Sequence, residues 1–71
     1  MDKEDVLEYF TYLDDLRDSG TTNMFGARPY LMEEFGLEKN FAAEILTGWM
    51  KTFDDEKSIP ERVGDFMATQ S

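Results

Sequence analysis

The chain contains neither cysteine nor histidine among its 71 residues. The lack of cysteine excludes disulfide bonds and thiolate metal sites. The lack of histidine removes the commonest transition-metal ligand and the usual general base. A domain of this size lies near the lower limit at which one hydrophobic core supports itself. Its stability must therefore come from side-chain packing or from association with another molecule.

The residue patterns typical of catalysis are also missing. No serine or threonine has a histidine to activate it, and no glycine-rich phosphate-binding loop occurs. The many carboxylates would need a cleft to work as a hydrolytic pair, and a small domain has little room for one. We therefore expect no enzyme, no metal and no cofactor, and accordingly no catalytic or cofactor-binding residues.

Basic residues are scarce as well, with seven lysines and arginines against sixteen acidic residues and a net charge of −9. The net charge is −5 over residues 1–20, −1 over 21–53 and −3 over 54–71. Such a surface repels phosphate backbones and anionic membranes and favours basic partners. The simpler interpretation of the same charge is solubility alone.

Long hydrophobic runs are also missing. No apolar stretch approaches the roughly 18 residues of a membrane span, and the N-terminus has no signal-peptide pattern. We therefore expect a soluble intracellular protein with no membrane partner.

Apolar residues do recur at the three- and four-residue spacing of an α-helix in four segments. The pattern predicts helices over 3–18, 29–35 and 38–53, and a weak helix over 60–68. We predict an all-α fold, with a small three-helix core domain over 1–56 anchored by Trp49. Residues 57–71 follow as a short amphipathic helix or tail, which either docks on the core or orders on a partner.

The second and third segments meet at a Gly-Leu corner. Gly36 fits the left-handed position that ends a helix, and Leu37 is placed for an apolar contact back to Met32. Ala42 and Ile45 follow six and nine residues after the glycine, as in helix-turn-helix motifs. The spacing predicts a helix-turn-helix-like corner, a geometry that helix pairs without DNA also use.

If this corner bound DNA, the third segment would contact the bases. Its outward positions are Lys39, Asn40, Ala43, Glu44, Thr47 and Lys51. They include only two bases and one acid, and a chain of net charge −9 attracts phosphates poorly. A DNA-linked role is therefore the alternative hypothesis, either as a helix-turn-helix DNA binder or as an acidic DNA mimic.

Three stretches are candidates for binding a protein partner. Met24 and Phe25 are large apolar residues in the connector after the first helix, where they either plug the core or form a presented tip. The first helix has a densely acidic side, and the C-terminal segment has an apolar face. The candidate partner-binding residues are Met24, Phe25, Glu4, Glu8, Asp15, Ile59, Val63, Phe66 and Met67.

Several short motifs are more specific than these patterns. The chain reads SG-x-TNMFGA-x-PYL from Ser19, FGL from Phe35 and WMKTF from Trp49. These motifs resemble a group of small uncharacterised helical proteins of bacteriophages and some bacteria, over about residues 4–53. The resemblance implies the cytoplasm of a bacterial host cell and transfers no catalytic residue.

Together, these features favour a non-catalytic, acidic protein-binding module. The resemblance implies a phage accessory or inhibitor protein that acts on a host or phage protein. The expected partner is a protein with a basic surface, and the chain itself is expected to be a monomer or a weak homodimer.

Overall fold

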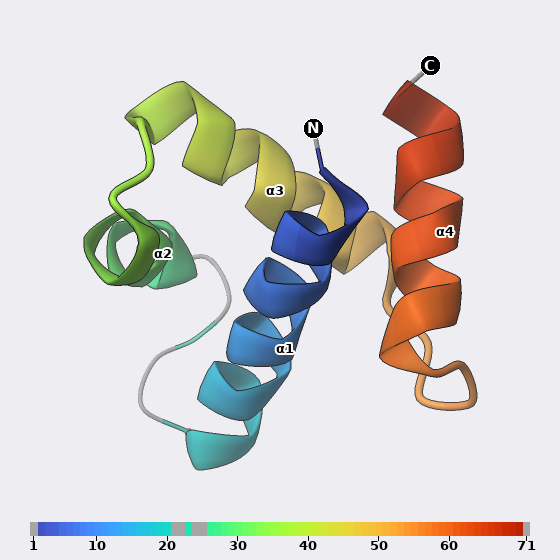
Figure 1. Cartoon of the computed structure of the whole chain (residues 1–71). Helices are drawn as coiled ribbons and strands as arrows, with labels where there is room; N and C mark the ends of the chain where they lie inside the picture. Colours follow the sequence, from blue (N-terminus) through green and yellow to red (C-terminus); the bar gives the residue numbers. More distant parts are fainter. Residues whose placement is uncertain (1, 21–22, 24–25, 71) are drawn as a thin grey trace.

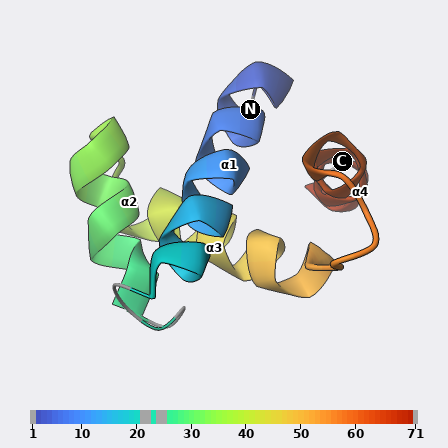
Figure 2. The same cartoon turned by 90° about the horizontal axis from the view of Figure 1, so that it is seen from below.

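The computed structural model describes residues 2–20, 23 and 26–70, and this part of the chain forms four α-helices and no strand (Figure 1). The helices are α1 (Lys3–Ser19), α2 (Ala27–Phe35), α3 (Lys39–Thr52) and α4 (Ile59–Gln70). α1 and α3 pack against each other in the middle, with α2 on one side and α4 on the other (Figure 2). The all-α prediction is confirmed. No described helix is both long enough and apolar enough to cross a membrane.

Local signals set both ends of α1. The Asp2 carboxylate accepts a hydrogen bond from the backbone N–H of Glu4 at 3.3 Å, which satisfies one free N–H of the first turn. Gly20 ends the helix with φ of 68°, a left-handed conformation that costs glycine little, and its N–H donates to the carbonyl of Arg17. The predicted helix over 3–18 is therefore confirmed to within one residue.

The Gly-Leu corner between α2 and α3 also follows its prediction. Gly36 has φ of 67°, and the Leu37 N–H donates to the Met32 carbonyl at 3.1 Å. Leu37 is half-buried against the hydrophobic core. The left-handed glycine and the backward hydrogen bond together end α2 and turn the chain into α3.

The C-terminal segment differs from its prediction. α4 is a well-formed helix of 12 residues, not the weak helix that was expected. Ser58 and Glu61 form a capping-box pair at its start. The Glu61 N–H donates to Ser58 Oγ and the Ser58 hydroxyl donates to the Glu61 carboxylate, both at 3.4 Å. Val63 and Phe66 are completely buried. Tertiary packing thus stabilises a helix that would be marginal alone.

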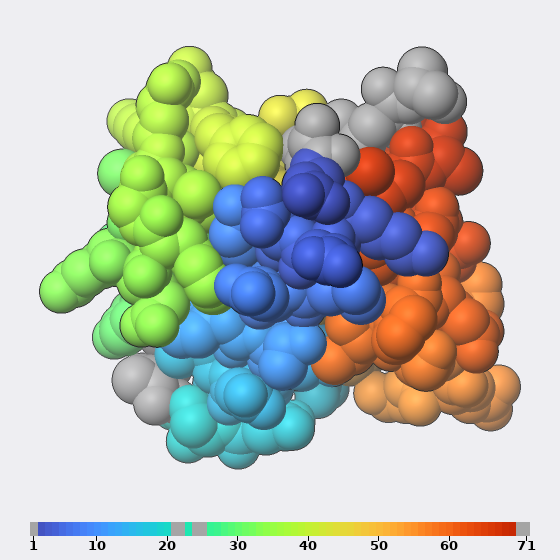
Figure 3. All heavy atoms as spheres, in the orientation of Figure 1, coloured from blue at the N-terminus to red at the C-terminus, as the bar shows by residue number. Residues whose placement is uncertain are grey.

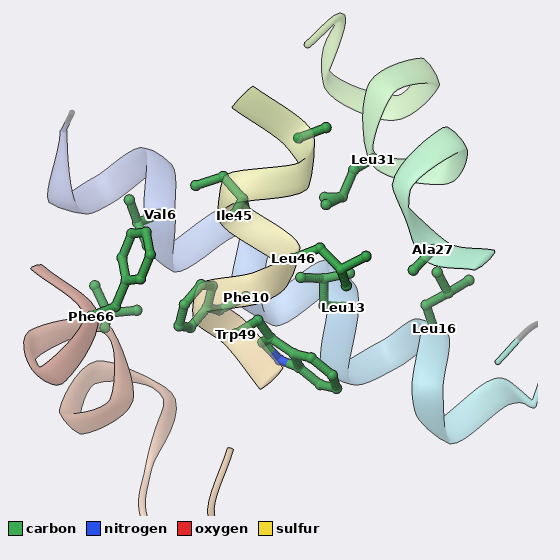
Figure 4. Packing of buried hydrophobic residues seen from close by; sticks show 12 residues of the cluster. Val6, Phe10, Leu13, Leu16, Ala27, Leu31, Ile45, Leu46, Trp49 and Phe66 are labelled. Carbon is green, nitrogen blue, oxygen red and sulfur yellow. The ribbon is translucent and has the colours of Figure 1, made fainter. Parts of the chain in front are cut away.

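All four helices contribute to one hydrophobic core (Figure 4). Its buried residues are Val6, Phe10, Leu13, Leu16, Ala27, Leu31, Ala42, Ile45, Leu46, Trp49, Val63 and Phe66. Trp49 is only 2% exposed, which confirms its predicted role as an anchor. The rings of Phe10 and Phe66 pack with centroids 5.5 Å apart, so α4 belongs to the same core as α1.

Gly48 in the middle of α3 lets α4 approach closely. A Cβ built at this position would overlap the ring of Phe66. Only a residue without a side chain fits here, and the helix accepts the roughly 1 kcal/mol that glycine costs relative to alanine. The absence of a side chain at Gly48 therefore permits the close contact between α3 and α4.

Candidate functional site

Three of the candidate partner-binding residues lie on the outward face of α1. Glu4, Glu8 and Asp15 are exposed and form one row with Thr11, because residues three and four apart share a helix face. We call this row the acidic stripe. At 1.5 Å of rise per residue it is about 16 Å long. Among the described residues its three acids have no ion-pair partner. In the space-filling view, α1 (blue to cyan) runs down the middle of the visible face, between α2 and α4 (Figure 3).

Two half-buried side chains, Leu7 and Tyr12, border the acidic stripe. The shallow hollow at this place, of about 340 Å³, is lined by Leu7, Glu8, Thr11, Tyr12 and Asp15. The Tyr12 ring packs edge-on against Phe35 with centroids 5.5 Å apart, and its hydroxyl donates to the backbone oxygen of Tyr30 at 3.5 Å. The stripe therefore combines exposed acids with a small, fixed apolar surface.

Burial raises the pKa of two tyrosines next to the acidic stripe. For Tyr9, the loss of hydration is the main cause of the raised pKa, and the negative charges of Asp5 and Glu8 add to it. For Tyr12, burial is again the main cause, followed by the charge of Glu34. The structure therefore disfavours a negative phenolate at both positions.

We expect the fold to lose stability at alkaline pH because of these tyrosines. Their pKa is higher in the folded chain, so their contribution is complete below the ordinary value of 10.0 and is lost as the pH rises through the folded value. Lys57, whose pKa is raised by its hydrogen bond to Asp65, acts in the same direction. Tyrosinate absorbance and helical circular dichroism, followed together during an alkaline titration, measure this loss.

A double variant separates the tyrosines from Lys57. Tyr9→Phe with Tyr12→Phe should reduce the alkaline loss, because it removes both tyrosines with a raised pKa and leaves Lys57 unchanged. The attribution to Tyr9 and Tyr12 is wrong if the double variant unfolds over the same alkaline range as the parent chain.

A polar cluster of Asp14, Trp49 and Arg62 joins α1, α3 and α4. Nη1 and Nη2 of Arg62 donate to the two carboxylate oxygens of Asp14 at 3.0 and 3.1 Å. Nε1 of Trp49 donates to Oδ1 of the same carboxylate at 2.8 Å. Such a two-pronged arginine–carboxylate pair is among the strongest side-chain interactions and fixes the orientation of both partners. The cluster therefore holds α4 in one position on α1 and α3.

Arg62 is only 2% exposed and is surrounded by aromatic rings. Its guanidinium lies 4.9 Å from the ring centre of Phe53 and 5.7 Å from that of Trp49. Its Nε has no hydrogen-bond partner among the described residues. The sequence did carry a signal for this burial, because Arg62 follows Ile59 by three residues and precedes Phe66 by four, so it lies on the apolar face of α4.

The other candidate residues are placed differently from the acidic stripe. Val63 and Phe66 are buried in the core, and Ile59 and Met67 are half-buried against it. The apolar face of α4 is thus covered by the rest of the chain. Met24 and Phe25 lie outside the described residues. The described residues also contain no group of three or more acidic side chains placed to hold a metal ion.

The outward face of α3 borders a groove. Asn40, Glu44, Thr47 and Lys51 are exposed on this face. The groove between α3 and α4, of about 560 Å³, is lined by Asn40, Ala43, Glu44, Thr47, Gly48, Lys51, Thr52, Asp65, Phe66 and Thr69. We call it the α3–α4 groove. Its lining combines polar side chains with apolar ones.

Comparisons with models of protein families, with curated proteins and with solved structures found no match to this chain.

Proposed function

We propose that this chain is a non-catalytic protein-binding module that uses the acidic stripe of α1 to bind a basic surface on a partner protein. The observation that carries the proposal is the acidic stripe itself: Glu4, Glu8 and Asp15 have no ion-pair partner among the described residues. Glu8 and Asp15 also line the hollow together with Leu7 and Tyr12. Exposed acids alone would serve solubility. A stripe that also presents apolar surface has the two components of an interface, a small apolar centre and a charged rim.

The geometry of α1 supports this proposal. The core and the Asp14 cluster hold α1 on α3 and α4, so the acids are presented on a rigid body. A rigid charged surface loses little conformational entropy when it binds. Its field would attract a basic partner and raise the association rate.

The resemblance of the SG-x-TNMFGA-x-PYL, FGL and WMKTF motifs to those of small phage and bacterial proteins suggests the setting. We infer an accessory or inhibitor role in the bacterial cytoplasm, in which the module binds a host or phage protein and changes what that protein does. A basic surface on the target, such as the nucleic-acid-binding face of a protein, would match the acidic stripe.

The test is an affinity capture from bacterial lysate with the parent chain and a neutralised variant. The variant carries Glu4→Gln, Glu8→Gln and Asp15→Asn. We expect it to bind the captured partner about ten- to a hundredfold more weakly at low salt, mainly through slower association. Titration by surface plasmon resonance at several salt concentrations measures both effects.

The control variant removes the same number of charges elsewhere. Glu33→Gln, Glu38→Gln and Glu56→Gln alter exposed acids outside the acidic stripe. This variant should retain the affinity of the parent chain. Equal weakening in the two variants would mean that only net charge matters, and undiminished binding by the stripe variant would refute the proposed surface.

The DNA-linked role is the second candidate, and the Gly36 corner is what favours it. In this proposal α2 and α3 form a helix-turn-helix-like pair, with α3 as the DNA-contacting helix. The groove beside the outward face of α3 carries Glu44 and Asp65, which oppose a phosphate backbone. A duplex DNA shift at low salt that weakens steeply with added salt would favour this candidate over protein binding. In the mimic form, DNA would instead compete with this chain for the captured partner.

A further inference from the structure

The outward face of α3 has the shape of a ridge between two hollows. The α3–α4 groove lies on one side of the ridge. On the other side is a hollow of about 250 Å³ lined by Arg28, Ala43, Leu46, Thr47 and Met50. Ala43 and Thr47 line both depressions, so they form the crest that separates them.

The middle of this ridge is made of short side chains. Ala43 and Thr47 therefore allow the backbone of another helix to come close. Helices pack by fitting the ridge of one into the groove of the other. A face that presents both a ridge and a groove is complementary to itself, which is the requirement for a two-fold symmetric interface.

The charges on the ridge are also complementary to themselves. Glu44 and Lys51 are exposed at opposite ends of the central part of α3, and neither has an ion-pair partner among the described residues. They are seven residues apart, about 10 Å along the helix. If two copies of α3 meet antiparallel near Thr47, Glu44 of each copy comes opposite Lys51 of the other.

The distribution of the net charge favours the same face. α1 and α3 lie against each other (Figure 2) and bury their inner sides in one core. The acidic stripe is on the outward face of α1 and therefore lies away from the outward face of α3. A chain of net charge −9 repels its own copies. The repulsion is weakest where the nearly neutral α3 faces meet and the two acidic stripes remain far apart.

We propose that the outward face of α3, with the α3–α4 groove, binds a second copy of this chain in an antiparallel, two-fold symmetric dimer. The interface centres on Thr47, and two Glu44–Lys51 ion pairs set its register. The dimer does not depend on the proposed function. If both hold, the dimer carries two acidic stripes on its outer sides and binds a repeated basic target with higher avidity than one copy.

Charge reversal and charge exchange test this interface by sedimentation velocity over a range of protein concentrations. In the Lys51→Glu dimer, Glu44 of each copy faces the new glutamate of the other copy, so both ion pairs become repulsive. We expect the dissociation constant of the dimer to rise at least about tenfold. The double variant Glu44→Lys with Lys51→Glu exchanges the charges and should restore the dimer to near the parent value.

Lys39→Glu is the matched control, because it changes the net charge by the same amount at an exposed position of α3 outside the ridge. Its dimer should dissociate like that of the parent chain. Circular dichroism confirms that each variant is folded. The proposal is overturned by a parent chain that stays monomeric at every concentration, by equal effects of Lys39→Glu and Lys51→Glu, or by a double variant that stays monomeric.

Discussion

Asp14→Ala should lower the free energy of unfolding by about 3 kcal/mol, the lower end of the 3–5 kcal/mol lost when one partner of a buried ion pair is removed. The substitution leaves the Arg62 guanidinium buried without its two acceptor oxygens and leaves Nε1 of Trp49 without its acceptor. The lower end applies because the Asp14 side chain is 26% exposed, so water can partly replace it. A chain of this size has a total stability of about 4–11 kcal/mol, so the loss is a large fraction of it.

Denaturant unfolding measures this loss, and the fluorescence of Trp49 reports on the cluster directly because the chain has one tryptophan. Asp15→Ala removes the same charge from an exposed neighbouring position and should change stability by no more than about 0.5 kcal/mol.

The double variant Asp14→Ala with Arg62→Met should recover part of the loss, since no buried charge remains. If Asp14→Ala and Asp15→Ala are equally stable, the cluster does not hold α4 as described.

This cluster also shows why part of the fold could not be predicted from the sequence. The ends of α1 and α2 depend on residues within a few positions of each other, such as Asp2 with Glu4 and Gly36 with Met32. The pair of Asp14 and Arg62 joins residues 48 positions apart. Helical spacing is enough to place Arg62 on the apolar face of α4, but no local rule identifies the acid on α1 that neutralises it.

The candidate site likewise has one part that the sequence predicts and one part that it does not. The exposure of Glu4, Glu8 and Asp15 follows from their position opposite the apolar stripe of α1, so the sequence was sufficient to place them on the surface. The apolar face of α4 was equally clear from the sequence. An amphipathic pattern does not say what covers its apolar side, and in this chain the cover is the core itself.

Gly48 determines how closely α4 can approach α3. Gly48→Ala should therefore lower the free energy of unfolding even though alanine is the better helix former. The gain in helix propensity is at most about 1 kcal/mol. Against it, the added Cβ overlaps the ring of Phe66, which is 1% exposed and packed against Phe10. Overpacking of this kind costs about 1–3 kcal/mol. Thermal and denaturant unfolding should show a net loss of about 1–2 kcal/mol.

Gly64→Ala in α4 is the matched control for Gly48→Ala. A Cβ at Gly64 meets nothing within 4 Å, so only the propensity term remains and the variant should gain up to about 1 kcal/mol. In a Phe66→Leu background the ring that meets Gly48 is gone, and Gly48→Ala should then turn from destabilising to neutral or stabilising. A Gly48→Ala effect that is the same with Phe66 and with leucine would show that the glycine is not needed for the approach of α4. The expected result is a loss of stability for Gly48→Ala, a gain for Gly64→Ala, and no loss for Gly48→Ala when Phe66 is leucine. That result would show that the contact between Gly48 and Phe66 holds the C-terminal helix α4 against α3.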